Sequence, residues 1–230
     1  MIQDITTTVQ SALAQEMKLE NIANHLANAT TTGFKADILS FDEELQVHST
    51  VDFTQGDFRE TGNVLDLALS GDGFFKIQTQ QGMRYTRNGN FSLNRDKILV
   101  TGNGDPVMGV NGPINIQGSN VQINDVQINE KGEVFVDLDR VSKLNIVTFP
   151  SKENLIKEGE SLFEYTGEAT DETGAETALV KQGSLEMPNT ILVIEMTKMV
   201  ETMRTYESYM KIIQTFDEVD SKLVNELGKV

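Results

Sequence analysis

The stretch LVIEMTKMVETMRTYESYMKII occupies residues 192–213 and decides the fold class of this chain. Its apolar side chains recur at alternating spacings of four and three residues, the heptad pattern of a helix that packs against another helix. This helix is predicted to begin after Pro188 and to continue to about Leu227. The predicted seam consists of Leu192, Met196, Met199, Met203, Tyr206, Met210 and Ile213.

A second amphipathic helix is predicted at the N-terminus, from near Gln3 to Asn28. It is expected to stop at residues 30–32, where three threonines disfavour helix, and at Gly33, which can adopt a left-handed turn. Two long helices at the chain ends are expected to pair as a coiled-coil-like inner domain. The predicted N-terminal seam consists of Ile2, Ile5, Val9, Ala12, Leu19, Ala23 and Leu26.

Between the helices the apolar period changes to two, with glycine-rich turns, which predicts short antiparallel strands. Asn88-Gly89 is a turn dipeptide, and the pair Val121/Ile123 is one of several predicted strands. We therefore expect an α+β chain with a central, mostly antiparallel all-β domain. The expected boundaries are residues 1–35 and 183–230 for a discontinuous helical assembly domain, 36–57 for an extended connector with a helical fragment at 42–45, and 58–182 for the β domain.

The composition excludes several functional classes. A formal net charge of -16 argues against binding nucleic acid or anionic membranes. No cysteine is present, so disulfides and thiolate sites are excluded. No window approaches the roughly 20 apolar residues of a membrane span. The first residues lack the basic segment of a secretory signal peptide, so we expect no direct membrane insertion and no cleaved signal.

The residues that carry chemistry are few. Only two histidines are present, His25 and His48, and we expect the first on a helix surface and the second in solvent. The glycines of Gly71-Asp72-Gly73 precede a predicted strand rather than a helix, so they indicate a turn and not a dinucleotide site. Acidic pairs such as Asp137/Asp139 lack the spacing of a calcium loop. We expect no enzyme activity, no cofactor and no metal.

Three ordered blocks of the sequence resemble the bacterial flagellar rod and hook proteins. The first comprises residues 19–28 and the following Thr31-Thr32-Gly33-Phe34-Lys35. The second runs from Gln55-Gly56 through residues 71–75 to 85–91, and the third runs from residue 182 to residue 207. The chain departs from the family pattern at His25, where asparagine is usual, at Lys97, where glycine is common, and at residues 187–191.

The resemblance implies a structural subunit of the flagellar basal-body rod that polymerises through its terminal helices into the axial drive shaft. The rod crosses the periplasm and transmits torque to the hook. The implied partners are copies of this chain, other flagellar rod proteins and the type III export apparatus. Only about 20 residues separate Gly33-Phe34-Lys35 from Gln55-Gly56, which favours a proximal over a distal rod subunit.

The expected assembly interface combines the C-terminal seam with positions from the family blocks. Three asparagines lie on one flank of the N-terminal helix, where they either bond across subunits or form a polar face. The competing functional class is an adhesin-like binding module, and a hydrolase is a more remote alternative. Besides the seven seam residues given above, the interface residues are Leu19, Asn21, Asn24, Leu26, Asn28, Gly33, Phe34, Lys35, Glu186 and Asn189.

Overall fold

The computed structural model describes residues 2–42, 46–116, 125–137, 139–159 and 161–227. Two sequence predictions lie outside the described residues in whole or in part, the helical fragment at 42–45 and the strand at Val121/Ile123. The chain divides into two compact units. The helical unit comprises Met1–Ala29, Asp37–Asp52 and Thr190–Val230, and the β unit comprises Thr30–Ala36 and Phe53–Asn189.

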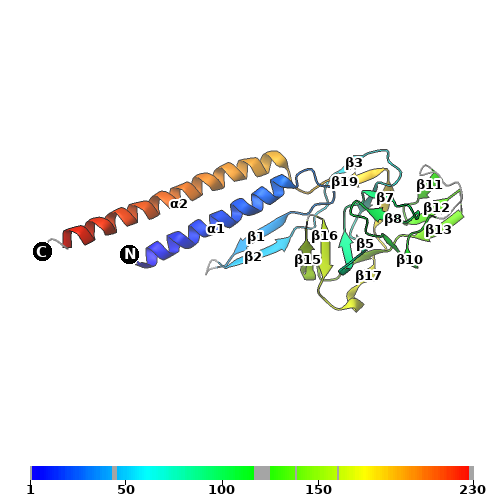
Figure 1. The fold of residues 1–230 in the computed structure, drawn as a ribbon, viewed down its shortest axis with the longest axis horizontal. Coiled ribbons are helices and arrows are strands. Elements are labelled where there is room, and N and C mark those ends of the chain that lie inside the picture. The colour runs from blue at the N-terminus through cyan, green and yellow to red at the C-terminus, as the bar shows by residue number, and fades with distance from the viewer. Residues whose placement is uncertain (1, 43–45, 117–124, 138, 160, 228–230) are drawn as a thin grey trace. The chain divides into compact units, whose positions relative to one another are not determined.

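Two long helices and one hairpin form the helical unit. Helix α1 (Ile2–Ala27) and helix α2 (Leu192–Leu227) lie side by side (Figure 1). The hairpin of β1 (Asp37–Phe41) and β2 (Val47–Val51) packs against α1 through β1. The predicted terminal helices are thus confirmed, together with the α+β class, while their coiled-coil character stays a proposal.

The hairpin occupies most of the segment that we expected to be an extended connector. Asp37 pairs with Val51 and Phe41 pairs with Val47 across the two strands. The ammonium group of Lys18 on α1 lies 5.1 Å from the centre of the Phe41 ring. The hairpin has no clear apolar period because most of its side chains are polar or exposed, and for this reason the sequence did not reveal it.

Every strand pair of the β unit is antiparallel among the described residues, as predicted. The largest sheet has the strand order β15-β16-β6-β5-β14-β17. Its strands are β15 (Leu155–Glu158), β16 (Leu162–Tyr165), β6 (Gly82–Thr86), β5 (Phe74–Thr79), β14 (Ile146–Thr148) and β17 (Thr173–Gly174).

Smaller sheets complete the β unit. One has three strands in the order β11-β12-β13, and the others are the pairs β18-β4, β19-β3, β7-β8 and β10-β9. Short 3-10 turns lie at Lys152–Asn154 and Ala169–Asp171. The strands are β3 (Phe58–Glu60), β4 (Leu67–Ser70), β7 (Phe91–Leu93), β8 (Leu99–Thr101), β9 (Met108–Gly109), β10 (Gly112–Pro113), β11 (Val126–Ile128), β12 (Glu133–Val136), β13 (Asp139–Lys143), β18 (Leu179–Gln182) and β19 (Ser184–Glu186).

One hydrophobic core lies beneath these strands. In β5, Phe75 and Ile77 point into this core and are fully buried, while Lys76 between them is only half-buried. Leu67 of β4 and Val134 of β12 join the same core. Apolar burial is the main stabilising contribution to such a unit, at roughly 1.5–3 kcal/mol for each large side chain.

The β unit is closed by its first and last strands. Strand β3 pairs with β19, placing Glu60 opposite Ser184 and Phe58 opposite Glu186. Residues 184–186 thus lie in the β unit, although we had expected the helical domain to begin at residue 183. Both ends of the β unit therefore meet in one two-stranded pair.

Lys97 adopts a positive φ of 61° in the turn between β7 and β8, at the position where the resemblance led us to expect glycine. A left-handed conformation costs an L-residue about 1–2 kcal/mol, and glycine is exempt. We expect Lys97→Gly to raise the free energy of unfolding by about 0.5–1 kcal/mol in urea titrations. Asp137, with φ 50°, is the control, because aspartate tolerates this region and Asp137→Gly should gain less. Equal gains at both positions would contradict this account.

Candidate functional site

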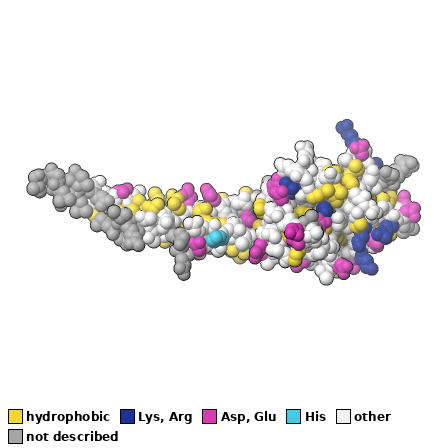
Figure 2. Space-filling model, turned by 90° about the horizontal axis from the view of Figure 1, so that it is seen from below, with side chains coloured by type: hydrophobic (Ala, Val, Ile, Leu, Met, Phe, Trp, Pro, Cys, Tyr) yellow, Lys and Arg dark blue, Asp and Glu magenta, His cyan; other side chains and the backbone are white. Residues whose placement is uncertain are grey.

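The helices of the helical unit carry many exposed apolar side chains. Met203 on α2 is 53% exposed and Leu13 on α1 is 53% exposed. Figure 2 shows hydrophobic side chains recurring along the surface of the helices. Exposed apolar side chains that recur along one element in this way are typical of interaction surfaces. The exposed set is Val9, Leu13 and Met17 on α1, with Leu192, Val193, Ile194, Met196, Val200, Met203, Met210, Ile212 and Val219 on α2.

The face of α2 that the chain itself covers is offset from the predicted seam. Among the described side chains of α2, the buried and half-buried ones also follow a heptad spacing, but it includes Glu195 and Thr202. Three predicted seam residues, Met199, Tyr206 and Ile213, lie on this covered face, and the other four are exposed. The covered face is Glu195, Met199, Thr202, Tyr206, Tyr209, Ile213 and Phe216.

The N-terminal seam is divided in the same way. On α1, Ala12 is buried and Leu19 and Leu26 are half-buried, whereas Val9 and Ala23 are exposed. The two helices therefore cover one apolar face each and leave a second apolar face uncovered within the chain.

His25 is buried, so the prediction of a helix-surface position was wrong. Its Nε2 accepts a hydrogen bond from the backbone N–H of Asp37 at 3.0 Å. Its Nδ1 lies 3.2 Å from Oε2 of Glu195 on α2. Because Nε2 accepts, the ring proton resides on Nδ1 and is donated to the carboxylate. One imidazole thereby links α1, α2 and β1. His48 is exposed, as expected.

Two of the three asparagines bond within the chain. Asn21 donates from Nδ2 to the carbonyl of Asp37 at 2.9 Å, beside the bond that His25 makes with the same residue. Asn28 is buried and donates from Nδ2 to the carbonyl of Asn24 at 3.0 Å. The side chain of Asn24 is exposed. Asn21 thus anchors the hairpin to α1, while Asn24 is available to a neighbour.

Glu195 provides a pH-dependent test of this joint. Burial alone would raise the pKa of its carboxyl, but hydrogen bonds from Lys198 and His25 outweigh burial and hold the pKa below 4.5. A pKa lower in the folded than in the unfolded state stabilises the fold above about pH 4.5, and this contribution is lost as the pH falls through the lowered pKa. We expect Glu195→Gln to be less stable than the parent near pH 7 and closer to it near pH 3.

Thermal unfolding followed by helical circular dichroism measures this difference. Glu201→Gln, at an exposed position of the same helix, is the control and should change little at either pH. A stability gap for Glu195→Gln that is as wide in acid as at neutral pH would refute the role given to the carboxylate.

A buried ionic junction in the β unit gathers the family residues of the loop before β1 and the end of β19. The side chains of Lys35 and Glu186 are both fully buried, and Nζ of Lys35 lies 2.6 Å from Oε1 of Glu186. Lys35 also donates to the carbonyl of Thr54 at 2.6 Å. The same Oε1 accepts the backbone N–H of Gly56 at 3.1 Å. Buried charges persist only when paired and hydrogen-bonded in this way.

Arg87 supplies a second cation to the junction. Its Nη1 lies 3.3 Å from Oε2 of Glu186, and its Nη2 donates to the carbonyl of Gly71 at 2.8 Å. Its guanidinium lies 5.3 Å from the centre of the Phe74 ring. Burial lowers the pKa of Arg87, although the nearby Glu186 and Asp72 carboxylates oppose this effect. An arginine stays charged regardless, so one carboxylate faces two cations.

Gly33 and Phe34 position Lys35. Gly33 has a φ of +70°, and a Cβ built there would lie 2.4 Å from the backbone nitrogen of Asn88. Phe34 is buried beneath Lys157, whose Nζ lies 4.0 Å from the ring centre. Only glycine allows so close an approach of two backbones together with a left-handed turn. The glycine of the Gly-Phe-Lys sequence is therefore required by the backbone conformation and by the close approach at residue 33.

Asn189 fastens the other end of the β unit. Its Oδ1 accepts the backbone N–H of Ala36 at 2.8 Å, and its Nδ2 donates to Oγ1 of Thr54 at 3.1 Å. Like Glu186, it thus connects the end of the β unit to residues 30–36 and 53–56. Five of the predicted interface residues, Gly33, Phe34, Lys35, Glu186 and Asn189, prove to be brought together in this junction.

The junction is suited to holding the chain and not to turning over a substrate. The carboxylate of Glu186 is engaged by two cations and a backbone N–H, so it has no role as a free base. Within the described residues no group of three or more acidic or histidine side chains is placed to hold a metal ion. The described helices also include none that is long and apolar enough to cross a membrane.

Sequence reasoning missed two members of these sites, Arg87 and Glu195. Arg87 lies in the family block at residues 85–91 but carried no signal of burial. Glu195 was not predicted because a neighbouring heptad frame of the same helix is more apolar, and that frame was taken as the seam. A search for a second heptad frame on the same helix would have found it.

Comparison with known families gives two matches. A family model described as "Flagellar hook protein FlgE/F/G D1 domain" matches residues 68–136. A second model, described as "Flagellar basal body rod FlgEFG protein C-terminal", matches residues 181–226. The first match lies in the β unit, and the second begins in β18 and extends through most of α2.

Several individual proteins are similar over nearly their whole length. The flagellar basal-body rod protein FlgF of Caulobacter vibrioides is 35% identical over 231 aligned positions, which cover 93% of each chain. The flagellar basal-body rod protein FlgG of Bacillus subtilis is 32% identical over 272 positions, covering 98% of this chain and 99% of the relative. FlgF of Mesorhizobium japonicum is 26% identical over 241 positions, covering 99% of both.

Proposed function

Since this chain belongs to the flagellar basal-body rod protein family, we propose that it is a subunit of the proximal rod that polymerises through its terminal helices. The observation that carries this proposal is the uncovered apolar face of α1 and α2. Heterologous contacts between such faces extend a helical array rather than close it. The array would form the axial drive shaft that transmits torque to the hook.

The division of labour follows from the two units. Within the expected assembly domain, residues 1–35 and 183–230, the assembly role is assigned to α1 and α2, which pair in a coiled-coil-like manner. Residues 30–35 and 183–189 of that range lie in the β unit. Residues 58–182 are proposed as the outward-facing β domain. The ionic junction then serves to fix the ends of that domain. Export of the subunit is assigned to the flagellar type III export apparatus, with copies of the chain and other rod proteins as assembly partners.

Energetics favour assembly through the exposed seam residues. Burying a methionine or leucine side chain fully is worth roughly 1.5–3 kcal/mol. Leu192, Met196, Met203 and Met210 are each between 36% and 55% exposed, so each has apolar area left to bury. Several such side chains per subunit offset much of the translational, rotational and side-chain entropy that is lost when a subunit is held in the rod.

A substitution on this face tests the proposal. We expect Met203→Asp to abolish rod assembly, because a carboxylate placed in an apolar interface is costly to desolvate. Met203 is exposed in the single chain, so the helical circular dichroism of the monomer should not change. Ser208→Asp, which introduces the same charge at an exposed polar position of α2, is the control and should assemble. Rods built normally from the Met203→Asp subunit would overturn the role of this face.

Imaging decides the position along the rod. Deleting the gene and complementing it with a tagged copy shows where the axis of purified basal bodies stops and where the tag lies. A stub that lacks the distal rod, with the tag in one narrow band, supports the proximal rod. A tag spread along the distal rod would instead identify the distal subunit. Intact flagella after deletion would contradict the proposal that the rod requires this chain.

A further inference from the structure

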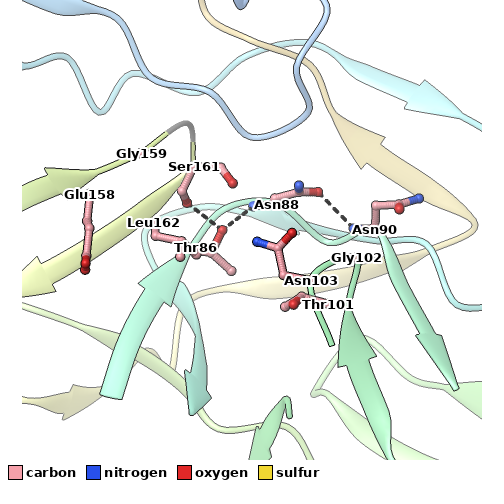
Figure 3. A pocket seen from close by; sticks show the side chains of 10 residues that line it. All are labelled: Thr86, Asn88, Asn90, Thr101, Gly102, Asn103, Glu158, Gly159, Ser161 and Leu162. Carbon is pink, nitrogen blue, oxygen red and sulfur yellow. Dashed lines mark hydrogen bonds between the residues drawn. The ribbon is translucent and has the colours of Figure 1, made fainter. Parts of the chain in front are cut away.

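The β unit carries a polar cavity of about 380 Å³ that the assembly proposal does not use. Its walls come from three segments, at the ends of β6, β8 and β15. The lining residues are Thr86, Asn88, Asn90, Thr101, Gly102, Asn103, Glu158, Gly159, Ser161 and Leu162. Figure 3 shows the side chains of Asn88, Asn90 and Asn103 along one side, with Glu158 and Leu162 on the other. The volume lies within the range of roughly 300–1,000 Å³ that is usual for small-ligand sites.

Hydrogen bonds hold the floor of the cavity in place. Thr86 donates from Oγ1 to the carbonyl of Ser161 at 2.7 Å and accepts the backbone N–H of Asn88 at 3.0 Å. The backbone N–H of Asn90 donates to Oδ1 of Asn88 at 3.0 Å. These three bonds are the dashed lines in Figure 3. The segments are therefore fixed before any ligand arrives, which lowers the entropy cost of binding.

Several polar groups around the cavity keep hydrogen-bonding capacity for a ligand. Oδ1 of Asn88 accepts from Thr32 and from Asn90, so its Nδ2 remains to donate, with no partner among the described residues. The side-chain amide of Asn103 and the hydroxyl of Ser161 likewise have no partner among the described residues. Together they offer both donors and acceptors.

The charge of the lining narrows the ligand class. The described residues that line the cavity include no lysine or arginine, which disfavours phosphates and carboxylates as ligands. Its single carboxylate among the described residues, Glu158, is already paired through Oε2 with Nε of Arg84, which disfavours a free cation. Leu162 is the only large apolar side chain among the lining residues that the structure describes, so a lipid or an aromatic ring would gain little by binding here. A neutral ligand rich in hydroxyl groups remains.

We propose that this cavity binds a neutral saccharide. The amides of Asn88 and Asn103 donate to sugar hydroxyls, and these hydroxyls donate in turn to Oδ1 of Asn103 and to the Glu158 oxygen that does not face Arg84. The methyl groups of Leu162 contact the apolar face of the ring. The site lies entirely in the β unit, so its occupancy does not depend on the assembly function.

Titration of the isotope-labelled full chain, followed by NMR, tests the site. The probes are glucose, N-acetylglucosamine and a disaccharide of each. We expect saturable shifts at millimolar sugar that centre on the amide signals of Asn88 and Asn103. Binding of monosaccharides and disaccharides alike, or of disaccharides alone, supports the proposal. Binding of disaccharides alone identifies a glycan chain as the source of the ligand. The absence of saturable shifts with all four sugars would overturn it.

Matched variants show where the sugar binds. Asn103→Ala, at an exposed turn position, removes one set of hydrogen bonds and should weaken binding about tenfold. Ser161→Ala gives an independent measure from the opposite segment. Asn111→Ala, at an exposed turn outside the cavity, is the control and should leave the titration unchanged. Shifts that survive both cavity variants place the sugar elsewhere and refute the proposal. A short neutral peptide that shifts the same signals when sugars do not would also refute it.

Discussion

Replacing Glu186 with alanine should destabilise the β unit by about 3–5 kcal/mol, because two buried cations lose their counter-charge. Lys35 and Arg87 both face this carboxylate, at 2.6 Å and 3.3 Å. The alanine variant leaves each cation away from water with backbone carbonyls as partners but without a counter-charge. The loss is a large fraction of the 5–15 kcal/mol that holds an ordinary domain together. Urea-induced unfolding followed by circular dichroism measures it.

Two further variants distinguish the stability contribution of the buried junction from that of an ordinary surface ion pair. Lys35→Met should cost less than Glu186→Ala, because Glu186 keeps Arg87 and the N–H of Gly56 as partners. Lys152→Met removes a largely exposed pair with Asp72 and should change stability by no more than about 1 kcal/mol. If Glu186→Ala were as mild as Lys152→Met, the junction would not stabilise the β unit.

Gly33→Ala should cost about 2–4 kcal/mol, the sum of a left-handed conformation and a backbone clash. The new Cβ would lie 2.4 Å from the nitrogen of Asn88 and 2.5 Å from the carbonyl carbon of Arg87. Backbone atoms cannot move aside as a flexible side chain can. The turn must therefore open, which carries Phe34 and Lys35 away from their buried positions. The same urea titration reports the effect.

Gly62 provides a control matched in backbone conformation. Its φ is +74°, and a Cβ built there would meet no atom within 4 Å. Gly62→Ala therefore isolates the conformational cost, about 1–2 kcal/mol. The difference between the two variants measures the close approach at Gly33. Equal destabilisation by both substitutions would show that the contact with residues 87–88 contributes nothing.

The sequence predicted those parts of the fold that have a strong apolar period. The terminal helices and the antiparallel β unit follow directly from spacings of three to four and of two. The hairpin of β1 and β2 was not predicted because its strands are short, and because Asp37 and Ser49 interrupt the face that carries its half-buried apolar side chains. The covered face of α2 was not predicted because the helix carries a second, more apolar stripe. Its most apolar stripe, which includes Met196 and Met203, is not the one that the chain covers with its own residues.

The polar contacts were beyond the reach of sequence patterns. Lys35 and Glu186 are separated by 151 positions, and His25 and Glu195 by 170. No local period connects residues so distant, and a buried lysine has the same letter as an exposed one. The family resemblance selected Lys35 and Glu186 without explaining them. His25, a departure from the family pattern, was expected at the surface because its place beside the seam says nothing of the hairpin that covers it.

The closure of the β unit has a consequence for how this family diversifies. Because β3 pairs with β19 and Lys35 is bound to Glu186, the chain enters and leaves the β unit at one place. Loops inserted between these points can lengthen the unit without displacing its ends. The body of the β unit can thus change in length as a module while the pairing at its two ends stays constant.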